Sequence, residues 1–361
     1  MKRDPNKPIA ALLLAWYGVA KRDLPWRRTS DPYRIWLSEI MLQQTTVSVV
    51  EGRFAPFLAK FPDLRTLAAA SEEKVVAAWS GLGYYSRARA FHRAARIVAA
   101  EHGGKVPSDA VAFRALPGVG PYTAGAVLSI AFGCREPLVD GNVARVLCRL
   151  FALHGDPVSG TLKKRLWTLA ADLLPARDPG DFNQAMMELG ALICTPAAPA
   201  CPACPLRKVC HAFAQGVVEL IPTRKKSAAT SRVRLAGALF ESGRGILLAR
   251  RSPEETPLAG MWLFPGGQVK RWADAPRLLT RIAGRALGAS VDVSRAPVVK
   301  VSHSITRYRI DFRLFEARFE NGPPSLRGLP RFAWVRRRGV AELPVSSLVT
   351  KSLGKLDQVR R

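Results

Sequence analysis

The chain has 361 residues, 48% of them hydrophobic, which is enough to build two domains with buried cores. Its 55 Lys and Arg residues outnumber 28 Asp and Glu, so the formal net charge is +27 at pH 7. A solvated basic surface is one explanation, but an excess this large favours a polyanionic partner. Six cysteines, four of them in one short loop, argue against a secreted disulfide framework.

The first apolar run, residues 9–20, has the marks of neither a cleaved leader nor a membrane span. Asp4 interrupts its basic start, and Lys21-Arg22-Asp23 stands where a leader would carry small residues before its cleavage site. The run is also too short to cross a bilayer. We therefore expect the first amphipathic helix of a cytoplasmic protein that makes no membrane contact.

A second helix is predicted to begin at Asp31-Pro32, with an N-cap followed by proline in the first turn. Its Glu39 has Ile35, Trp36 and Leu42 as helical neighbours. A carboxyl group among apolar side chains loses solvation, so its pKa should rise and it could hold a proton near neutral pH. The helix alone favours another interpretation, in which Glu39 lies at the edge of the apolar face and points to water.

Helical patterns follow over residues 51–61, 71–80 and 86–101. The break before the last of these, GLGYYSR, combines two glycines with Tyr84, its neighbouring tyrosine and Arg87. Aromatic side chains beside basic ones can wedge into a base stack and hold its backbone. An ordinary glycine turn capped by packed tyrosines is an equally good interpretation.

Residues 116–142 (LPGVGPYTAGAVLSIAFGCREPLVDGN) form the most informative stretch. Gly118 and Gly120 flank Val119, and Pro121 then opens an apolar helix, a position that suits proline. Backbone amides at such a helix start can hold a phosphate without a charged side chain.

An isolated carboxylate, Asp140, comes one short loop later. It precedes a helical apolar stripe over residues 143–150, so its simplest role is to cap that helix. A phosphate-binding turn followed by a carboxylate nevertheless suggests chemistry on a nucleic acid.

Four cysteines, Cys194, Cys201, Cys204 and Cys210, share a proline-rich loop over residues 194–210. Thiolates gathered in one loop indicate either zinc or an iron–sulfur cluster. A structural zinc site usually has two Cys-x2-Cys pairs, and only one close pair is present, so the spacing favours a [4Fe–4S] cluster. No ligand position is obviously open, which favours a structural or DNA-docking role.

The periodicity changes after a proline-containing basic segment. Residues 233–240 and 245–250 flank Glu241-Ser242-Gly243 like a hairpin, residues 308–314 alternate like a half-buried strand, and residues 276–287 form a helical pattern. The sequence thus predicts a mostly α-helical domain over 1–221, a basic linker over 222–231 and an α+β domain over 232–361.

The segments LPWR, WLSEIMLQQT, GLGYYSRAR, LPGVGPYTAGA, VDGNV and FNQAMMELGALICT precede the Cys-x6-Cys-x2-Cys-x5-Cys loop. In this order they make the first half resemble the helix-hairpin-helix DNA glycosylase superfamily, and within it the adenine DNA glycosylase (MutY) family. The resemblance covers roughly residues 24–210. It implies a monomeric base-excision repair enzyme with one [4Fe–4S] cluster on the four cysteines, acting on double-stranded DNA with 8-oxoG:A or G:A mispairs.

The resemblance also assigns roles to four residues. Glu39 matches the acid that protonates adenine N7, and Asp140 matches the carboxylate that stabilises the oxocarbenium-like sugar. Asn142 matches a residue that orients the reacting groups. Tyr122 stands where related bifunctional glycosylases carry a lysine nucleophile, so efficient strand cleavage is not expected.

The target adenine must leave the base stack before Glu39 can reach it. The resemblance implies contacts of three kinds: Gln44 and Tyr84, with Arg87 beside them, where the bases separate; Trp26, Arg27, Leu42 and Glu188 around the adenine; and the amides of Gly118, Val119 and Gly120 on a phosphate.

The second half resembles the family's C-terminal domain, a relative of Nudix hydrolases that senses 8-oxoguanine. Aligning a Nudix box on Gly267 shows every acidic position lost, to Ala273, Ile282, Arg285 and Ala286. Without these carboxylates nothing would hold the catalytic Mg²⁺, so a Nudix-like fold without pyrophosphohydrolase activity is expected.

The loop that faces 8-oxoguanine departs from the family pattern. In the run His303-Ser304-Ile305-Thr306-Arg307, Thr306 keeps a hydroxyl and Arg307 replaces an imidazole by a fixed charge. We expect discrimination between 8-oxoG:A and G:A to be altered.

Two other functions stay open at this point. A bifunctional glycosylase-lyase acting on oxidised pyrimidines is disfavoured by Tyr122 and by the second domain. A non-enzymatic iron–sulfur DNA-binding protein would require Glu39 and Asp140 to be merely structural.

Overall fold

The computed structural model describes residues 7–223, 230–252, 254–255, 258–305 and 308–360. The chain divides into two compact units, of which the first comprises residues 1–69 and 89–226 and the second residues 70–88 and 227–361. This division after residue 226 falls within the predicted linker, most of which lies outside the described residues, and the domain bounds stay a prediction.

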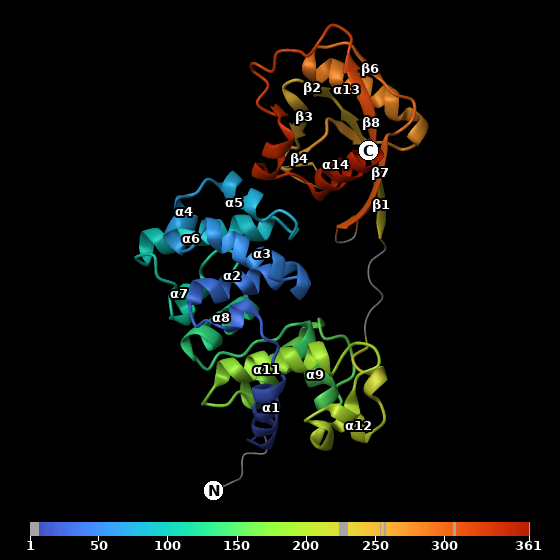
Figure 1. Ribbon diagram of the computed structural model, residues 1–361. Coiled ribbons are helices and arrows are strands. Elements are labelled where there is room, and N and C mark those ends of the chain that lie inside the picture. The colour runs from blue at the N-terminus through green and yellow to red at the C-terminus, as the bar shows by residue number, and fades with distance from the viewer. Residues whose placement is uncertain (1–6, 224–229, 253, 256–257, 306–307, 361) are drawn as a thin grey trace. The chain divides into compact units, whose positions relative to one another are not determined.

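The first unit is built from helices, as predicted (Figure 1). Its α-helices are α1 (Lys7–Ala20), α2 (Pro32–Leu42), α3 (Val47–Lys60), α4 (Leu64–Ala69), α6 (Ser86–Glu101), α7 (Ala110–Arg114), α8 (Pro121–Phe132), α9 (Gly141–Leu150), α10 (Gly160–Leu173), α11 (Pro179–Leu192) and α12 (His211–Ala214). Short 3-10 turns cover Pro25–Arg27, Cys201–Ala203, Arg207–Val209 and Val218–Leu220. The helix expected over 51–61 begins earlier, at Val47.

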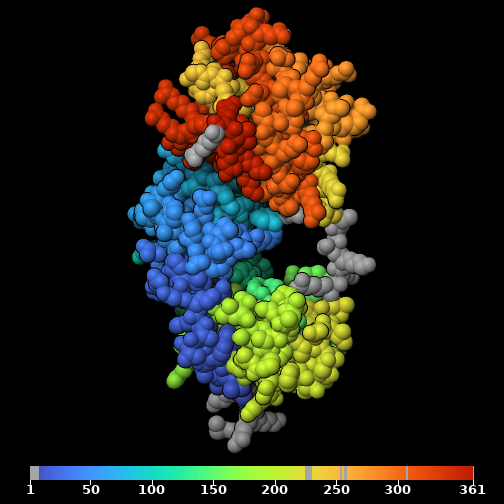
Figure 2. Space-filling model, turned by 45° about the vertical axis from the view of Figure 1, so that its right-hand side comes forward, coloured from blue at the N-terminus to red at the C-terminus, as the bar shows by residue number. Residues whose placement is uncertain are grey.

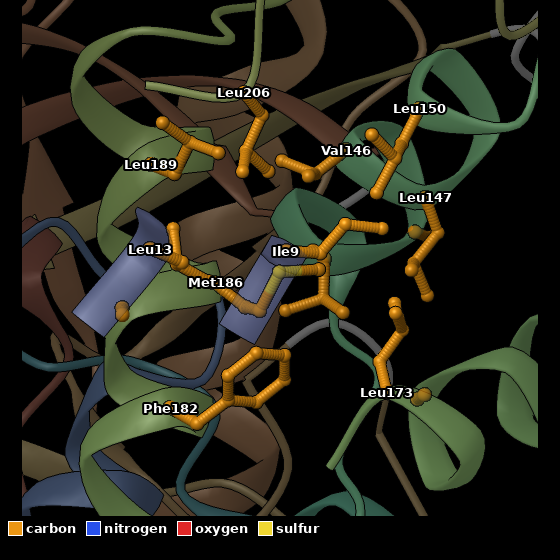
Figure 3. Close-up of a cluster of buried hydrophobic side chains, with 14 of the residues drawn as sticks. Ile9, Leu13, Val146, Leu147, Leu150, Leu173, Phe182, Met186, Leu189 and Leu206 are labelled. Carbon is orange, nitrogen blue, oxygen red and sulfur yellow. The ribbon is translucent and has the colours of Figure 1, made fainter. Parts of the chain in front are cut away.

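One apolar core ties α1, α9, α10 and α11 together (Figure 3). Leu13, Leu147 and Leu189 are buried in it, and in Figure 3 Leu206 from the cysteine loop lies beside them. Because Cys204 also packs against this core, the loop is anchored to the same helices that carry Asp140 and Glu188. Figure 2 shows the segments of this unit from the two ends of its sequence, dark blue and yellow-green, packed into one body.

A second core joins α2 to α6 and α7. Trp36 is fully buried and meets Phe91 and Phe113 edge to face, with ring centroids 4.9 and 5.0 Å apart. This packing fixes the rotation of α2 about its axis, and therefore the direction in which Glu39 points.

The second unit is α+β, also as predicted. It contains helices α5 (Glu72–Ala78), α13 (Ala275–Leu287) and α14 (Ser347–Val359), 3-10 turns over Trp272–Asp274 and Arg337–Glu342, and strands β1 (Ser231–Leu239), β2 (Glu241–Ser242), β3 (Gly245–Arg250), β4 (Trp262–Leu263), β5 (Gly266–Gln268), β6 (Val291–Val293), β7 (Val299–Ile305), β8 (Tyr308–Phe319) and β9 (Phe332–Val335). The expected helix over 71–80 is shorter, because Ser71 caps α5.

The strands form two sheets. The larger has the order β5-β1-β8-β6 with β7 also on β8, and the smaller has the order β2-β3-β4 with β9 on β3. The predicted hairpin between residues 233–240 and 245–250 is wrong: the turn joins the short β2 to β3, while β1 pairs in parallel with β8. Residues 235–239 are buried on both faces, which is typical of a central strand.

Two helices cover this larger sheet. The α14 helix packs with Leu348 and Leu356 on the side of Val301 and Phe312, whereas α13 packs with Leu279 and others on the side of Ala236 and Phe315. The α13 helix ends at Gly288, whose φ of 62° suits glycine, as the sequence predicts. Among the described residues no helix is long and apolar enough to cross a membrane.

Candidate active site

A cavity of about 190 Å³ lies between α2, α8, α9 and α11 of the first unit. Glu39, Tyr122, Asp140 and Asn142 all line it, and so does Glu188. The helices bring together residues that are as much as 149 positions apart in the sequence, from Glu39 to Glu188. Its other lining residues are Arg22, Leu24, Trp26, Arg27, Leu42, Thr45, Val47, Gln184, Met187 and Ala191.

Glu39 is only 5% exposed, so the interpretation that it points to water is wrong. The pKa of its carboxyl group is raised to about 7: burial is the largest cause and nearby Asp140 adds to the rise, while the hydrogen bond from Tyr122 and the charge of Arg27 oppose it. A carboxyl group with this pKa exchanges a proton near neutral pH, as the apolar helix neighbours suggest.

The Tyr122 hydroxyl group is the direct partner of Glu39. It donates a hydrogen bond of 2.6 Å to Glu39 Oε2 and lies 3.5 Å from Met187 Sδ. Burial, followed by the charges of Glu39 and Asp140, raises the pKa of Tyr122 well above its usual value. The phenol therefore stays neutral and acts as a hydrogen-bond donor.

Asp140 both caps a helix and faces the cavity. Its Oδ1 accepts a 2.7 Å hydrogen bond from the Val143 amide at the start of α9, and its Oδ2 accepts a 3.2 Å bond from Asn142 Nδ2. Burial raises the pKa of this carboxyl group, and these hydrogen bonds oppose the rise. The capping role expected from position alone is therefore real, and it leaves Oδ2 facing Asn142.

Asn142 is itself held by Arg145, a buried residue that the sequence analysis missed. Arg145 Nη2 donates to Asn142 Oδ1 at 2.8 Å and to the Gly190 carbonyl at 2.7 Å, and Nε donates to the Cys194 carbonyl at 2.7 Å. A Cβ at Gly190 would lie 2.6 Å from Asn142 Cβ, so only glycine lets α11 approach this closely.

Glu188 also lines the cavity and is 1% exposed. Arg22 donates to both of its oxygens at 2.8 and 2.6 Å, and Arg27 does so at 2.9 Å each. Burial is the largest single influence and raises the pKa of Glu188, but the bonds from the two arginines together lower it to about 2. Arg22 was considered in the sequence only as part of a charged run, since no local pattern shows a partner 166 residues away.

Trp26 and Leu42, the two other residues predicted to lie around the adenine, line the cavity together with Arg27 and Glu188. Gln44 does not line it: this exposed residue lies in the turn after α2, with a φ of 56°. Its contact with a base stack stays a prediction.

Tyr84 and Arg87 lie in the segment 70–88 of the second unit, which includes the first residues of α6. The Arg87 guanidinium stacks on the rings of Trp79 and Tyr84, 5.6 and 5.3 Å from their centroids, and its Nη2 donates to the carbonyls of Leu82 and Gly83. Burial lowers the pKa of Arg87 to about 10. These contacts are those of the packed glycine turn that the sequence analysis gave as the alternative interpretation. A DNA contact by either residue stays a prediction.

The glycine turn before α8 differs from the expectation in one residue. Gly118 has a φ of 80° and Gly120 caps the helix, but the Val119 amide already donates to the Leu116 carbonyl at 3.1 Å. That amide is therefore not available to a phosphate. A phosphate contact by Gly118 and Gly120 stays a prediction.

The four cysteines line one small cavity with Arg149. Arg149 Nη1 donates to Cys194 Sγ at 3.4 Å and to the Thr195 carbonyl at 2.7 Å, and Nε bonds two further carbonyls, so a buried arginine of α9 shapes the loop. Within the described residues no three Cys, His, Asp or Glu side chains are arranged around a single metal ion. A cluster in which each iron takes its own thiolate needs cysteines spread around a cavity, and this donor set fits it.

The residues expected to face 8-oxoguanine, Thr306 and Arg307, lie outside the described residues. Their neighbour His303 is described: its Nε2 lies 2.8 Å from Ser347 Oγ, and its Nδ1 lies 3.4 Å from Lys351 Nζ. These contacts fasten β7, the strand that leads to the two residues, to the start of α14.

Two family models match the chain. Residues 37–171 match the HhH-GPD superfamily base excision DNA repair protein model, and residues 235–355 match the NUDIX domain model. The human adenine DNA glycosylase is 36% identical over 94% of this chain and 72% of its own length. The chain belongs to the adenine DNA glycosylase family. The family's member from Arabidopsis thaliana is 38% identical over 75% of this chain and 49% of its own length.

Solved structures agree with the fold of the first unit. A thermostable thymine-DNA glycosylase is 33% identical with a TM-score of 0.53, and the match covers 58% of this chain and 97% of that one. A non-covalent endonuclease III–DNA complex, 23% identical with a TM-score of 0.50 over 58% of this chain and 95% of that one, shows the same fold. The chain is thus a DNA glycosylase of base-excision repair that binds duplex DNA and removes adenine from it.

Proposed function

We propose that the protein removes adenine mispaired with 8-oxoguanine or guanine and does not cleave the DNA strand efficiently. The observation that carries this proposal is one cavity lined by the carboxyl groups of buried Glu39 and half-buried Asp140 and by Tyr122, whose hydroxyl group bonds Glu39. A lyase would need an amine where Tyr122 stands.

Glu39 is the general acid in this proposal. Its pKa of about 7 keeps a useful fraction protonated at neutral pH, so it can give its proton to adenine N7 and turn the base into a better leaving group. The base must first be flipped into the cavity, whose lining combines apolar side chains with polar and charged ones.

Asp140 faces the sugar in this proposal and stabilises the oxocarbenium-like charge that develops as the glycosidic bond breaks. Its Oδ1 is tied to the start of α9, and Asn142 orients Oδ2, so the carboxylate is held before the charge appears. A fixed negative charge costs less reorganisation than a mobile one.

The part of the cavity lined by Glu188, its two arginines, Trp26 and Leu42 is proposed to recognise the base. The pair of arginines around Glu188 forms a rigid polar end, while Trp26 and Leu42 supply apolar surface for a flat ring. Because Glu188 stays ionised, it does not compete with Glu39 as a proton donor.

We further propose that Cys194, Cys201, Cys204 and Cys210 hold one [4Fe–4S] cluster. Such a cluster would supply a fixed charged group that links the loop sulfurs covalently, and no step of adenine release passes through it. Arg149 and Leu206 already fasten the loop to α9 and the core, which supports a structural role.

For the second unit we propose that Thr306 and Arg307, which follow β7 in the sequence, recognise the base opposite adenine. The α13 helix lies where a Nudix hydrolase carries its metal-binding acids, and Ile282, Arg285 and Ala286 replace them. We propose a monomer that acts on chromosomal DNA in the cytoplasm.

Single-turnover cleavage of a labelled duplex tests the proposal, with 8-oxoG:A, G:A, 8-oxoG:C, G:T and thymine-glycol duplexes compared before and after hot alkali. We expect breaks at adenine only after alkali, fastest opposite 8-oxoguanine. Breaks without alkali, or cleavage at thymine or the oxidised pyrimidine instead, would overturn the assignment of Tyr122 and of the substrate.

A further inference from the structure

One half of one sheet face in the second unit carries an unusual set of side chains. Strands β1, β8 and β7 lie side by side, with β8 in the middle. Their register places Arg309 of β8 between Arg232 of β1 and Ser304 of β7. The same alternation brings five cations, two hydroxyls and one acid to this face. We call it the basic sheet face: Arg232, Arg234, Lys300, Ser302, Ser304, Arg309, Asp311 and Arg313.

Neither helix covers this half of the sheet. The alternate residues Val233, Val301 and Ile310 belong to the core on the α14 side, so the basic residues point the other way. On that other side α13 packs farther along, against Ala236, Phe315 and Ala317. In Figure 1 the helix lies toward the end of the sheet opposite the start of β1. Arg232, Arg234, Lys300 and Arg309 are all exposed.

The arrangement works against folding. Arg232 lies directly opposite Arg309, and Lys300 lies directly opposite Arg313, and like charges in such cross-strand positions are destabilising. Asp311 is the one carboxylate on this face, and its nearest contact with Arg313 is 3.9 Å. Within the part of the chain that is described, Arg232 and Arg309 have no ion pair, so their charges are uncompensated.

Two other members of the face are held in place. Arg234 donates to the Lys270 carbonyl at 2.8 Å, and the Arg313 guanidinium lies 4.0 Å from the centre of the Trp272 ring. Arg313 Nε is buried without a hydrogen-bond partner among the described residues. The stack fixes the direction of the Arg313 side chain on this face.

We propose that the basic sheet face binds backbone phosphates of duplex DNA, on the strand beside the base that Thr306 and Arg307 are proposed to read. The face carries the charge complementary to a phosphate row, and Ser302 and Ser304 add hydroxyl donors of the kind that contact phosphate oxygens. Ile305 and Tyr308 pair at the end of the same two strands, so the face ends beside the residues that precede and follow Thr306 and Arg307 in the sequence. This proposal rests on the proposed recognition of DNA by the second unit.

The test removes the like-charge pair from the full-length protein with Arg232→Gln and Arg309→Gln together. Binding is measured from 50 to 200 mM salt on a duplex with 8-oxoguanine opposite a 2′-fluoro-deoxyadenosine, which resists cleavage. Each lost phosphate contact lowers the slope of log Kd against log salt by about 0.9, so we expect a slope lower by about 1.8 and roughly tenfold less sensitivity over this range. The rate of adenine release at saturating enzyme should not change.

Two further variants make the result specific. Arg232→Lys with Arg309→Lys keeps both charges and should keep the slope. Arg295→Gln with Arg327→Gln removes two exposed arginines from loops elsewhere in the same unit and should leave the slope nearly unchanged. The unfolding temperature of the Gln pair should not fall, because a like-charge pair is removed.

An unchanged slope in the Gln pair, or an equal fall in the loop control, would overturn the proposal. So would loss of 8-oxo-dGTP binding with the DNA slope unchanged, which would assign the face to a free nucleotide. Failure of the proposed function is distinguished separately, since it would show as absent adenine release in the unaltered protein.

Discussion

Two buried glutamates line the cavity, and their pKa values are shifted in opposite directions. Glu39 is 5% exposed and has its pKa raised to about 7, whereas Glu188 is 1% exposed and has its pKa lowered to about 2. Burial acts on both in the same direction. The hydrogen-bonding and charged partners set the direction of the net pKa shift. Glu39 has a neutral hydroxyl group and a neighbouring carboxylate, whereas Glu188 has two guanidinium groups.

This comparison teaches that burial alone does not make a catalytic acid. An ion pair keeps a buried carboxyl group charged, so that it organises the wall of a site. A buried carboxyl group without a directly paired cation keeps its proton up to a higher pH and can transfer it. The predictions below change Glu39 or Glu188, or the partners of one of them, at a time.

The largest effect is expected from Glu39→Gln, which keeps the shape of the side chain and removes its proton donor. Adenine release should fall by about 10²- to 10⁴-fold while duplex affinity stays within a few-fold. Glu188→Gln is the matched variant, and we expect it to lose stability first and activity much less. Equal losses of activity in the two variants would break the comparison.

Removing the two arginines that bond Glu188 should mainly lower the free energy of unfolding. Arg22→Met with Arg27→Met leaves Glu188 as an uncompensated buried charge, which typically costs about 3–5 kcal/mol of unfolding free energy. Denaturant unfolding at pH 7 measures it. The control is Arg28→Met, because its pair with Asp23 is exposed and should contribute nothing measurable. A stable double variant would contradict this account of Glu188.

The raised pKa of Glu39 also makes stability depend on pH. The unfolded carboxyl group ionises at its usual pKa and the folded one only near 7, so its contribution is fully present below the usual pKa and is lost as pH rises to about 7. The loss amounts to about 3 kcal/mol. The difference in unfolding free energy between the wild type and Glu39→Gln, followed from pH 4.5 to 8, should show it, and a difference independent of pH would refute it.

The smallest effect is expected from Tyr122→Phe. The phenol donates to the ionised form of Glu39, so its removal should raise the pKa of Glu39 further and move the alkaline limb of the rate profile to higher pH. At pH 7 the rate should change by less than about tenfold. Tyr33→Phe is the control, since its buried hydroxyl bonds the Phe61 carbonyl. A shift of the limb in both variants would rule out a direct effect.

The sequence predicted most of the helices, and it singled out Glu39, Tyr122, Asp140 and Asn142, which the structure brings together in one cavity; their catalytic roles stay a prediction. It did not predict Arg22 or Arg145, whose partners lie on distant helices. The burial of Glu39 was equally out of reach of its own helix, since Tyr122 on α8 and the residues of α11 close the cavity around it.

The same limit explains the error at β1. Its nearest strand in sequence is part of the other sheet, and its parallel partner β8 begins 77 positions later, from Ser231 to Tyr308. Alternation of apolar residues identifies a strand but not its neighbour, which is chosen by long-range packing.

The most direct test of the central claim is the pH dependence of adenine release at enzyme concentrations below saturation, from pH 5.5 to 9, on an 8-oxoG:A duplex. This regime reports the ionisation of the free enzyme. We predict a rate that falls about tenfold per pH unit above a midpoint near 7, with duplex affinity unchanged over that range. A rate that stays flat through pH 9 would contradict the assignment of Glu39 as the proton donor.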